Sequence, residues 1–119
     1  MGKPGYVYFM SNRERGVIYI GVTSDLLRRV WQHREGVVEG FTKKYNLKRL
    51  VYFECYDTIE TAILYEKKLK NIGRSKKIAI IERMNSGWLD LWPEIAGEEI
   101  SCHPASREAA AQDLSDDVQ

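Results

Sequence analysis

The sequence predicts a small α/β (α+β) domain in which helices flank a three-stranded, largely antiparallel sheet, in the order ββαβαα. Three runs rich in β-branched and aromatic residues, 6–10, 17–21 and 50–56, are typical of strands. The first two runs flank a short polar loop and therefore predict a hairpin. Segments with apolar residues at helical spacing follow the second and third runs, which favours helices packed against the sheet.

The hairpin is predicted to bring two phenols together. A register symmetric about the polar loop 11–16 places Tyr8 directly opposite Tyr19, and directly opposed residues point to the same face of a sheet. Gly21 continues that face without a side chain. Cross-strand tyrosines also pack well for purely structural reasons, so the pair alone does not define a site.

Capping and breaking residues set the limits of the other elements. The three predicted helices are one capped by 23–25 that runs to about Arg34 and ends at Gly36, one from about Thr58 to Lys70 opened by Asp57 with Glu60 and stopped by Gly73, and one capped by Ser75 through about Met84. After a turn at 85–87, apolar residues are predicted to fold back as a hydrophobic clasp: Trp88, Leu89, Leu91 and Trp92.

Charge is divided unevenly along the chain. Residues 1–95 carry 17 Lys and Arg against 11 Asp and Glu, a net charge of +6, whereas residues 96–119 carry one Arg against six acidic residues, a net charge of −5. The second segment has almost no large apolar residue, so we expect a domain over 1–95 and a flexible acidic C-terminal tail over 96–119. The basic body, with Phe41 and Tyr45 interleaved among its lysines, suits a polyanion partner and equally suits a solvated surface.

Composition favours a cytoplasmic protein. No stretch approaches the ~20 apolar residues that a membrane-spanning helix requires. The N-terminus runs directly into a strand-like segment and leaves no room for a signal peptide. Cys55 and Cys102 form no metal-binding spacing, and we expect both to be reduced thiols.

The first helix carries two candidate ligand-binding residues. Arg29 and His33 are spaced i,i+4 and share a face that borders the predicted apolar stripe, which comprises Leu26, Leu27, Val30 and Trp31. An arginine and a histidine at the edge of a core-facing surface can reach one ligand. A solvent-facing arginine and a capping histidine are the structural alternative.

Glu66 is a carboxylate on a predicted buried stripe. The stripe of its helix comprises Ile59, Ala62, Ile63 and Leu69, and Glu66 falls among them. Burial of a carboxylate is costly unless it is ion-paired or bound to a metal. Both readings are open, and a salt bridge to a nearby Lys or Arg is the commoner one.

Together, these residues resemble the signature of the GIY-YIG nucleases: Tyr6-Val7-Tyr8, Tyr19-Ile20-Gly21, Arg29 and His33. Four downstream segments are similar to the stand-alone, single-domain branch of that superfamily: 40–45, 50–54, 66–70 and 74–77. The resemblance covers roughly residues 5–92. It implies the same sheet-and-helix fold and an endonuclease that hydrolyses phosphodiester bonds of DNA with a divalent metal, Mg²⁺ or Mn²⁺.

By position, the resemblance also implies roles for individual residues. Tyr8 and Tyr19 match the two tyrosines of the family motifs, and Arg29 matches its essential arginine. His33 matches a histidine found in part of the family, and Glu66 its single metal-binding glutamate. We expect Tyr8 to be the general base, with Tyr19 orienting water or phosphate, although the reverse assignment is open. His33 either holds a tyrosine or relays a proton.

A tyrosine base requires a pKa below its usual value of ~10. The neighbouring tyrosine, Arg29 and the metal are expected to supply that shift. Arg29 would also clamp a non-bridging phosphate oxygen, for which its planar fork is suited.

The sequence departs from the family pattern at three places. Tyr6 occupies the position of the name-giving glycine, and Ile72 stands where this branch often has tryptophan. A late asparagine of the family has two candidates, Asn85 and Asn71.

A non-catalytic nucleic-acid-binding module on the same scaffold is the alternative function. A protein partner that targets the substrate is also consistent with the lack of a separate DNA-recognition domain.

Overall fold

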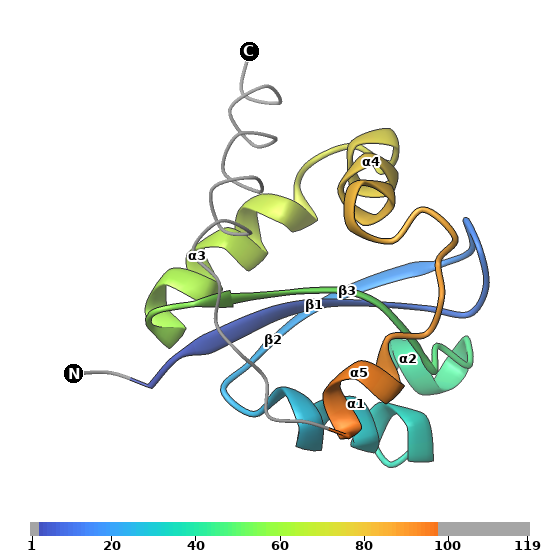
Figure 1. Cartoon of the computed structure of the whole chain (residues 1–119), viewed down its shortest axis with the longest axis horizontal. Helices are drawn as coiled ribbons and strands as arrows, with labels where there is room; N and C mark the ends of the chain where they lie inside the picture. Colours follow the sequence, from blue (N-terminus) through green and yellow to red (C-terminus); the bar gives the residue numbers. More distant parts are fainter. Residues whose placement is uncertain (1–2, 98–119) are drawn as a thin grey trace.

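The computed structural model describes residues 3–97, which form an antiparallel sheet in the order β2-β1-β3 with helices on both faces (Figure 1). In chain order the elements are β1 (Gly5–Ser11), β2 (Ile18–Thr23), α1 (Leu26–Glu35), α2 (Phe41–Lys44), β3 (Arg49–Tyr56), α3 (Ile59–Lys70), α4 (Arg74–Met84) and α5 (Trp92–Ala96). The predicted fold class and the ββαβαα order are confirmed, and the short helices α2 and α5 are additions to it. Most of the predicted tail 96–119 lies outside the described residues.

The register of the hairpin differs from the prediction. Tyr8 lies opposite Gly21, and Tyr19 lies opposite Met10, so the predicted direct pairing of the two tyrosines is wrong. The shift between the two registers is two residues. Because side chains alternate with a period of two along a strand, Tyr8 and Tyr19 still share one face of the sheet.

The loop of the hairpin explains the shift. Strand β1 continues through Ser11, and the loop therefore spans 12–17 instead of 11–16. Within it, the backbone N–H of Val17 donates to Oδ1 of Asn12 at 3.0 Å, and Gly16 N–H donates to the carbonyl of Arg13 at 3.0 Å. A side-chain contact closes this loop, which a symmetric reading of the polar residues does not anticipate.

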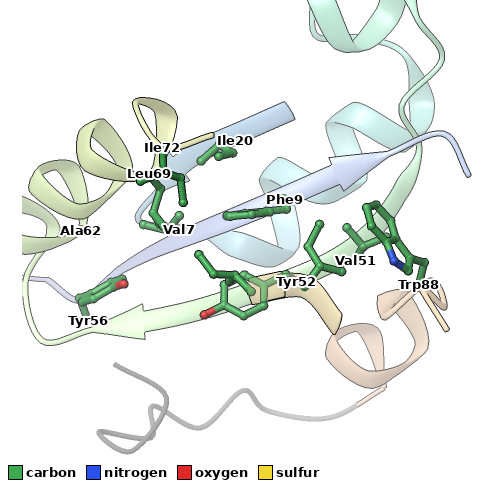
Figure 2. Close-up of a cluster of buried hydrophobic side chains, with 12 residues drawn as sticks. Val7, Phe9, Ile20, Val51, Tyr52, Tyr56, Ala62, Leu69, Ile72 and Trp88 are labelled. Atoms are coloured by element: carbon green, nitrogen blue, oxygen red, sulfur yellow. The ribbon is translucent and has the colours of Figure 1, made fainter. Parts of the chain in front are cut away.

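The sheet is covered by apolar side chains on both faces. One core lies between the sheet and α3 with α4 (Figure 2) and comprises Val7, Phe9, Ile20, Val51, Tyr52, Tyr56, Ala62, Leu69, Ile72, Ile80, Ile81 and Trp88. A second core lies on the side of α1 and α5 and comprises Tyr8, Met10, Leu26, Val30, Leu47, Leu50, Leu91 and Ile95. The central strand β1 contributes to both cores, which holds its side chains rigidly.

The limits of α1 agree with the prediction. The side chain of Asp25 accepts a hydrogen bond from the N–H of Arg28, and this N-cap satisfies one of the unpaired amides of the first turn. Gly36 ends the helix with φ 73°, in the left-handed region that glycine adopts without strain. The helix therefore starts and stops at residues whose chemistry is visible in the sequence.

The predicted caps of the next two helices are wrong by one or two residues. Thr58, and not Asp57, caps α3, because its hydroxyl accepts the N–H of Thr61 at 3.2 Å. Gly73 is the N-cap of α4, a position predicted for Ser75. Boundaries of this kind depend on backbone angles that flanking residues do not fully determine.

The predicted hydrophobic clasp is confirmed in part. Trp88 and Leu91 are buried, and Trp92, which begins α5, packs against the second core. Leu89 is exposed, so its predicted place in the clasp is wrong. Within 3–97, no helix combines the length and the apolar character needed to cross a membrane.

Cys55 lies buried on β3. The expectation that both cysteines are reduced thiols also involves the second cysteine of the chain and stays a prediction. Cys102 lies outside the described residues.

Candidate active site

Helix α1 turns His33 into the core. Its buried residues are Leu26, Val30 and His33, spaced i, i+4 and i+7. Leu27 and Trp31, which were predicted to share the apolar stripe, are exposed. The helix is thus rotated slightly from its predicted orientation. His33 is buried against the sheet, whereas Trp31, which was predicted to be buried, faces the solvent.

A buried hydrogen-bond chain joins three elements at this point. Nε2 of His33 lies 2.9 Å from the hydroxyl oxygen of Tyr8, and its Nδ1 lies 2.8 Å from Oγ1 of Thr42. Tyr8 comes from β1, His33 from α1 and Thr42 from α2. Because a neutral imidazole has one donor and one acceptor nitrogen, all the protons in this chain point in the same direction.

Thr42 is a site residue that the sequence reasoning missed. It lies in a helix of only four residues, too short to show a periodic pattern, and it is surrounded by exposed basic and aromatic residues. It is nevertheless buried. A small hydroxyl residue between two exposed neighbours is the only local sign of its role.

The two tyrosines and the histidine form one cluster of rings. Ring centroids are 6.3 Å apart for Tyr8 and Tyr19, 5.5 Å for Tyr8 and His33, and 5.6 Å for Tyr19 and His33. Gly21 makes this packing possible. A Cβ atom at Gly21 would lie 2.5 Å from Cζ of Tyr8, so any side chain there would displace the phenol.

Arg29 is half-buried and acts electrostatically on this cluster. Burial raises the pKa of Tyr8 well above its usual value, and the neighbouring Tyr19 raises it further, whereas the charge and hydrogen bonding of Arg29 lower it. The expected lowering of the Tyr8 pKa by Arg29 is therefore confirmed, whereas the expected lowering by the neighbouring tyrosine is wrong, and the net shift is upward. Desolvation outweighs the single favourable charge.

His33 is held in its neutral form. Its burial, followed by the positive charge of Arg29, lowers the pKa of the imidazole to about 4. At pH 7 the ring is therefore uncharged and can both donate and accept in the chain between Tyr8 and Thr42.

This shift predicts a pH dependence of stability. The folded pKa of His33 lies below the unfolded value of about 6.5, so the unfolded chain binds the extra proton between these values and stability falls as the pH drops from about 6.5 to about 4. We expect up to about 3 kcal/mol of unfolding free energy to be lost over this window. The measurement is urea unfolding at several pH values for the wild type and His33→Gln.

The glutamine variant supplies the control, because it cannot titrate in this range and leaves all other ionisable groups in place. Its unfolding free energy should change less than that of the wild type between pH 6.5 and pH 4. Parallel curves for the two proteins would contradict a depressed histidine pKa.

Glu66 lies on the buried stripe of α3, as predicted, between Ala62 and Leu69. Its Oε2 accepts an ion pair from Nζ of Lys70 at 2.6 Å, which is the salt-bridge alternative stated above. The stripe packs on the face of the sheet opposite to Tyr8. Lys70 is the residue that links Glu66 to the ring cluster. Its Nζ lies 5.9 Å from the centroid of the Tyr19 ring, which belongs to the edge strand β2.

The described residues around Glu66 suit a metal site that has one protein carboxylate and several water ligands. Within residues 3–97, no three His, Cys, Asp or Glu side chains converge to form a full protein cage. A single, nearly buried carboxylate that already holds a cation suits Mg²⁺, which usually binds through one or two carboxylates and keeps several waters. Glu66 is the residue that would hold such an ion, and Lys70 would have to give up its place.

The contacts of the two candidate asparagines, Asn85 and Asn71, lie outside the ring cluster. Nδ2 of Asn85 donates to the carbonyls of Val51 and Leu89, and its Oδ1 accepts the N–H of Leu89. Its amide is thereby used to fix the turn after α4 to β3, the strand farthest from β2. Asn71 is the exposed C-cap of α3.

A polar groove leads to Arg29 from the surface. Its lining consists of Lys3, Thr23, Ser24, Asp25, Arg28, Arg29 and Gln32. Other basic residues of the sequence have structural contacts instead: Arg34 pairs with Asp90, and Arg74 donates to the carbonyls of the hairpin loop. Through this groove, Arg29 can be reached from the surface.

Comparison with known proteins identifies the family of the chain. The chain matches the GIY-YIG catalytic domain family over residues 4–79. It is 35% identical over 77 residues to a UPF0213 protein of Haloquadratum walsbyi, covering 65% of this chain and 85% of that protein. It is also 31% identical over 84 residues to a UPF0213 protein of Bacillus pumilus, covering 71% and 86% of the two chains. No significant match to a solved structure was found. Because the family match spans most of the chain, the protein belongs to the GIY-YIG catalytic domain family.

Proposed function

We propose that this protein is a metal-dependent endonuclease that hydrolyses phosphodiester bonds of DNA. The observation that carries the proposal is the buried chain from Thr42 through His33 to the hydroxyl of Tyr8, with the guanidinium of Arg29 beside it. A buried phenol fixed by a neutral imidazole and flanked by a cation is an arrangement suited to moving a proton during an attack on an anion.

The chain offers a route for the proton of the attacking water. With Nδ1–H of His33 donating to Thr42, Nε2 accepts the phenol proton of Tyr8. As water attacks phosphorus, its proton passes to the Tyr8 oxygen while the phenol proton passes to His33, and the phosphorus–oxygen bond to the leaving group breaks. Tyr8 then never needs to become a free phenolate, which its raised pKa disfavours.

Arg29 links substrate binding to this step. A phosphodiester bound to the guanidinium brings negative charge beside His33 and offsets the positive charge that depresses the histidine pKa. Substrate would thus make the imidazole a better acceptor. The same guanidinium stabilises the negative charge that grows on the phosphoryl oxygens in the transition state.

Glu66 would hold the divalent ion, which when bound supplies charge stabilisation at the leaving oxygen. In its absence Lys70 neutralises the carboxylate. Tyr19 lies close to both Lys70 and Tyr8, and this position supports a role in orienting water or phosphate.

A binding module without turnover is the second candidate, and the ion pair between Glu66 and Lys70 is the observation in its favour. A carboxylate satisfied by a lysine needs no metal to be stable. On this alternative, the basic groove at Arg29 binds the phosphate backbone and no bond is cut.

Removal of the metal separates the two candidates. We expect cleavage of labelled single-stranded, duplex or branched DNA in Mg²⁺ or Mn²⁺, and none in EDTA. Because Lys70 neutralises Glu66 without metal, EDTA should leave the circular dichroism spectrum and the Tm almost unchanged. The measurement is one oligonucleotide panel, including an RNA strand of the same sequence, with thermal melts alongside.

Glu66→Gln should reproduce the effect of EDTA in the presence of Mg²⁺. Glu60→Gln is its matched control, because Glu60 is exposed on the same helix. Undiminished cleavage in EDTA would remove the metal from the proposal. Binding without any cut, indifferent to Mg²⁺, would favour the binding module.

A further inference from the structure

Three aromatic rings form a continuous run from the ring cluster to the surface. Tyr19 of β2 stacks on Phe41 with centroids 6.2 Å apart and an interplanar angle of 26°, and Phe41 contacts Tyr45 with centroids 4.8 Å apart. The outer two rings are exposed, Phe41 by 46% and Tyr45 by 42%. Large aromatic surfaces that contribute little to the core invite a functional explanation.

Helix α2 fixes this run beside the proposed site. Its Thr42 is buried and in contact with His33, while the preceding Phe41 and the later Tyr45 face outward. The helix lies on the same side of the sheet as α1 (Figure 1). One short helix therefore both holds the histidine and presents two rings at the edge of the ring cluster.

The charges around the rings favour a nucleic acid over an apolar partner. Nζ of Lys44 lies 5.4 Å from the Tyr45 ring centroid, and Nζ of Lys70 lies 5.9 Å from that of Tyr19. Lys43 is also present, paired at 2.9 Å with Glu39. Exposed aromatic faces bordered by lysines are typical of surfaces that stack single-stranded bases and contact their phosphates.

The geometry points to a specificity element. We propose that Phe41 and Tyr45 form a stacking platform for an unpaired nucleobase next to the phosphate that is cut, so that the enzyme prefers single-stranded or locally unpaired nucleic acid. This inference rests on the proposed function for the position of the cut, but the platform itself acts in binding. In a duplex the base faces are already stacked on one another and cannot reach these rings.

Equilibrium binding in EDTA tests the platform without any cleavage. We expect fluorescein-labelled single-stranded DNA to bind the full chain more tightly than its duplex at low salt. Phe41→Ala or Tyr45→Ala should weaken single-strand binding roughly 5- to 150-fold and change duplex binding much less. A single abasic nucleotide placed at each position in turn should, at one position, weaken wild-type binding and abolish the difference between wild type and variant.

Two variants serve as controls. Phe41→Tyr keeps a ring and should retain wild-type affinity, whereas Trp31→Ala removes an exposed aromatic outside the run and should have no effect. Equal losses for single strand and duplex, or unchanged binding in Phe41→Ala and Tyr45→Ala, would overturn the platform, as would no binding to any oligonucleotide. Cleavage that persists with such a result would leave the proposed nuclease standing and remove only the platform.

Discussion

Arg29→Ala is expected to slow single-turnover cleavage by about 10²- to 10³-fold, by analogy with the loss of one preorganised donor in other active sites. The guanidinium contacts charge that develops mainly in the transition state, so the rate should suffer far more than the affinity. Several other basic side chains border the same groove, including Lys3 and Arg28, and they maintain ground-state binding. The measurement is single-turnover cleavage beside equilibrium binding.

Arg28→Ala is the matched control for this variant. Arg28 is the adjacent residue on α1, carries the same charge and lines the same groove, but it is exposed and does not act on the pKa of Tyr8 or His33. Its removal should weaken binding slightly without a specific loss of rate. Equal effects of the two substitutions would show that Arg29 contributes only general charge.

The sequence predicted the strands and helices well because their signals are local. Gly36 ends α1 where its left-handed conformation is needed, and the three β-rich runs each became a strand. The register of the hairpin was wrong because the side chain of Asn12 closes the loop, and such a contact leaves no periodic signal. Periodicity still kept Tyr8 and Tyr19 on one face.

The cluster was less predictable than the fold. The spacing of Arg29 and His33 correctly put them near one surface, but only tertiary packing shows that His33 is buried and that Thr42 holds it. The raised pKa of Tyr8 likewise depends on burial, which a sequence does not reveal. The ion pair between Glu66 and Lys70 could have been predicted from the sequence, because the two residues have the i,i+4 spacing that is usual for ion pairs on a helix.

Tyr8→Phe is expected to abolish cleavage, with a loss on the order of 10²- to 10⁴-fold for a general base. The variant keeps the ring and its packing above Gly21 and removes only the oxygen bonded to His33. Leaving Nε2 of His33 unpaired should cost about 1–3 kcal/mol of stability, too little to mimic unfolding in a stable domain. Tyr6→Phe, two residues earlier on the same face of β1, is the matched control.

The most direct test of the central claim, that the phenol of Tyr8 moves the proton of the attacking water, is the single-turnover rate of wild type and Tyr8→Phe on one labelled oligonucleotide in Mg²⁺. Circular dichroism and equilibrium binding establish that both proteins are folded and bind the substrate. We predict cleavage by the wild type and by Tyr6→Phe, and bound but uncut substrate with Tyr8→Phe. Cleavage by Tyr8→Phe at the wild-type rate would contradict the proposed role of Tyr8 and the hydrogen-bond chain built on it.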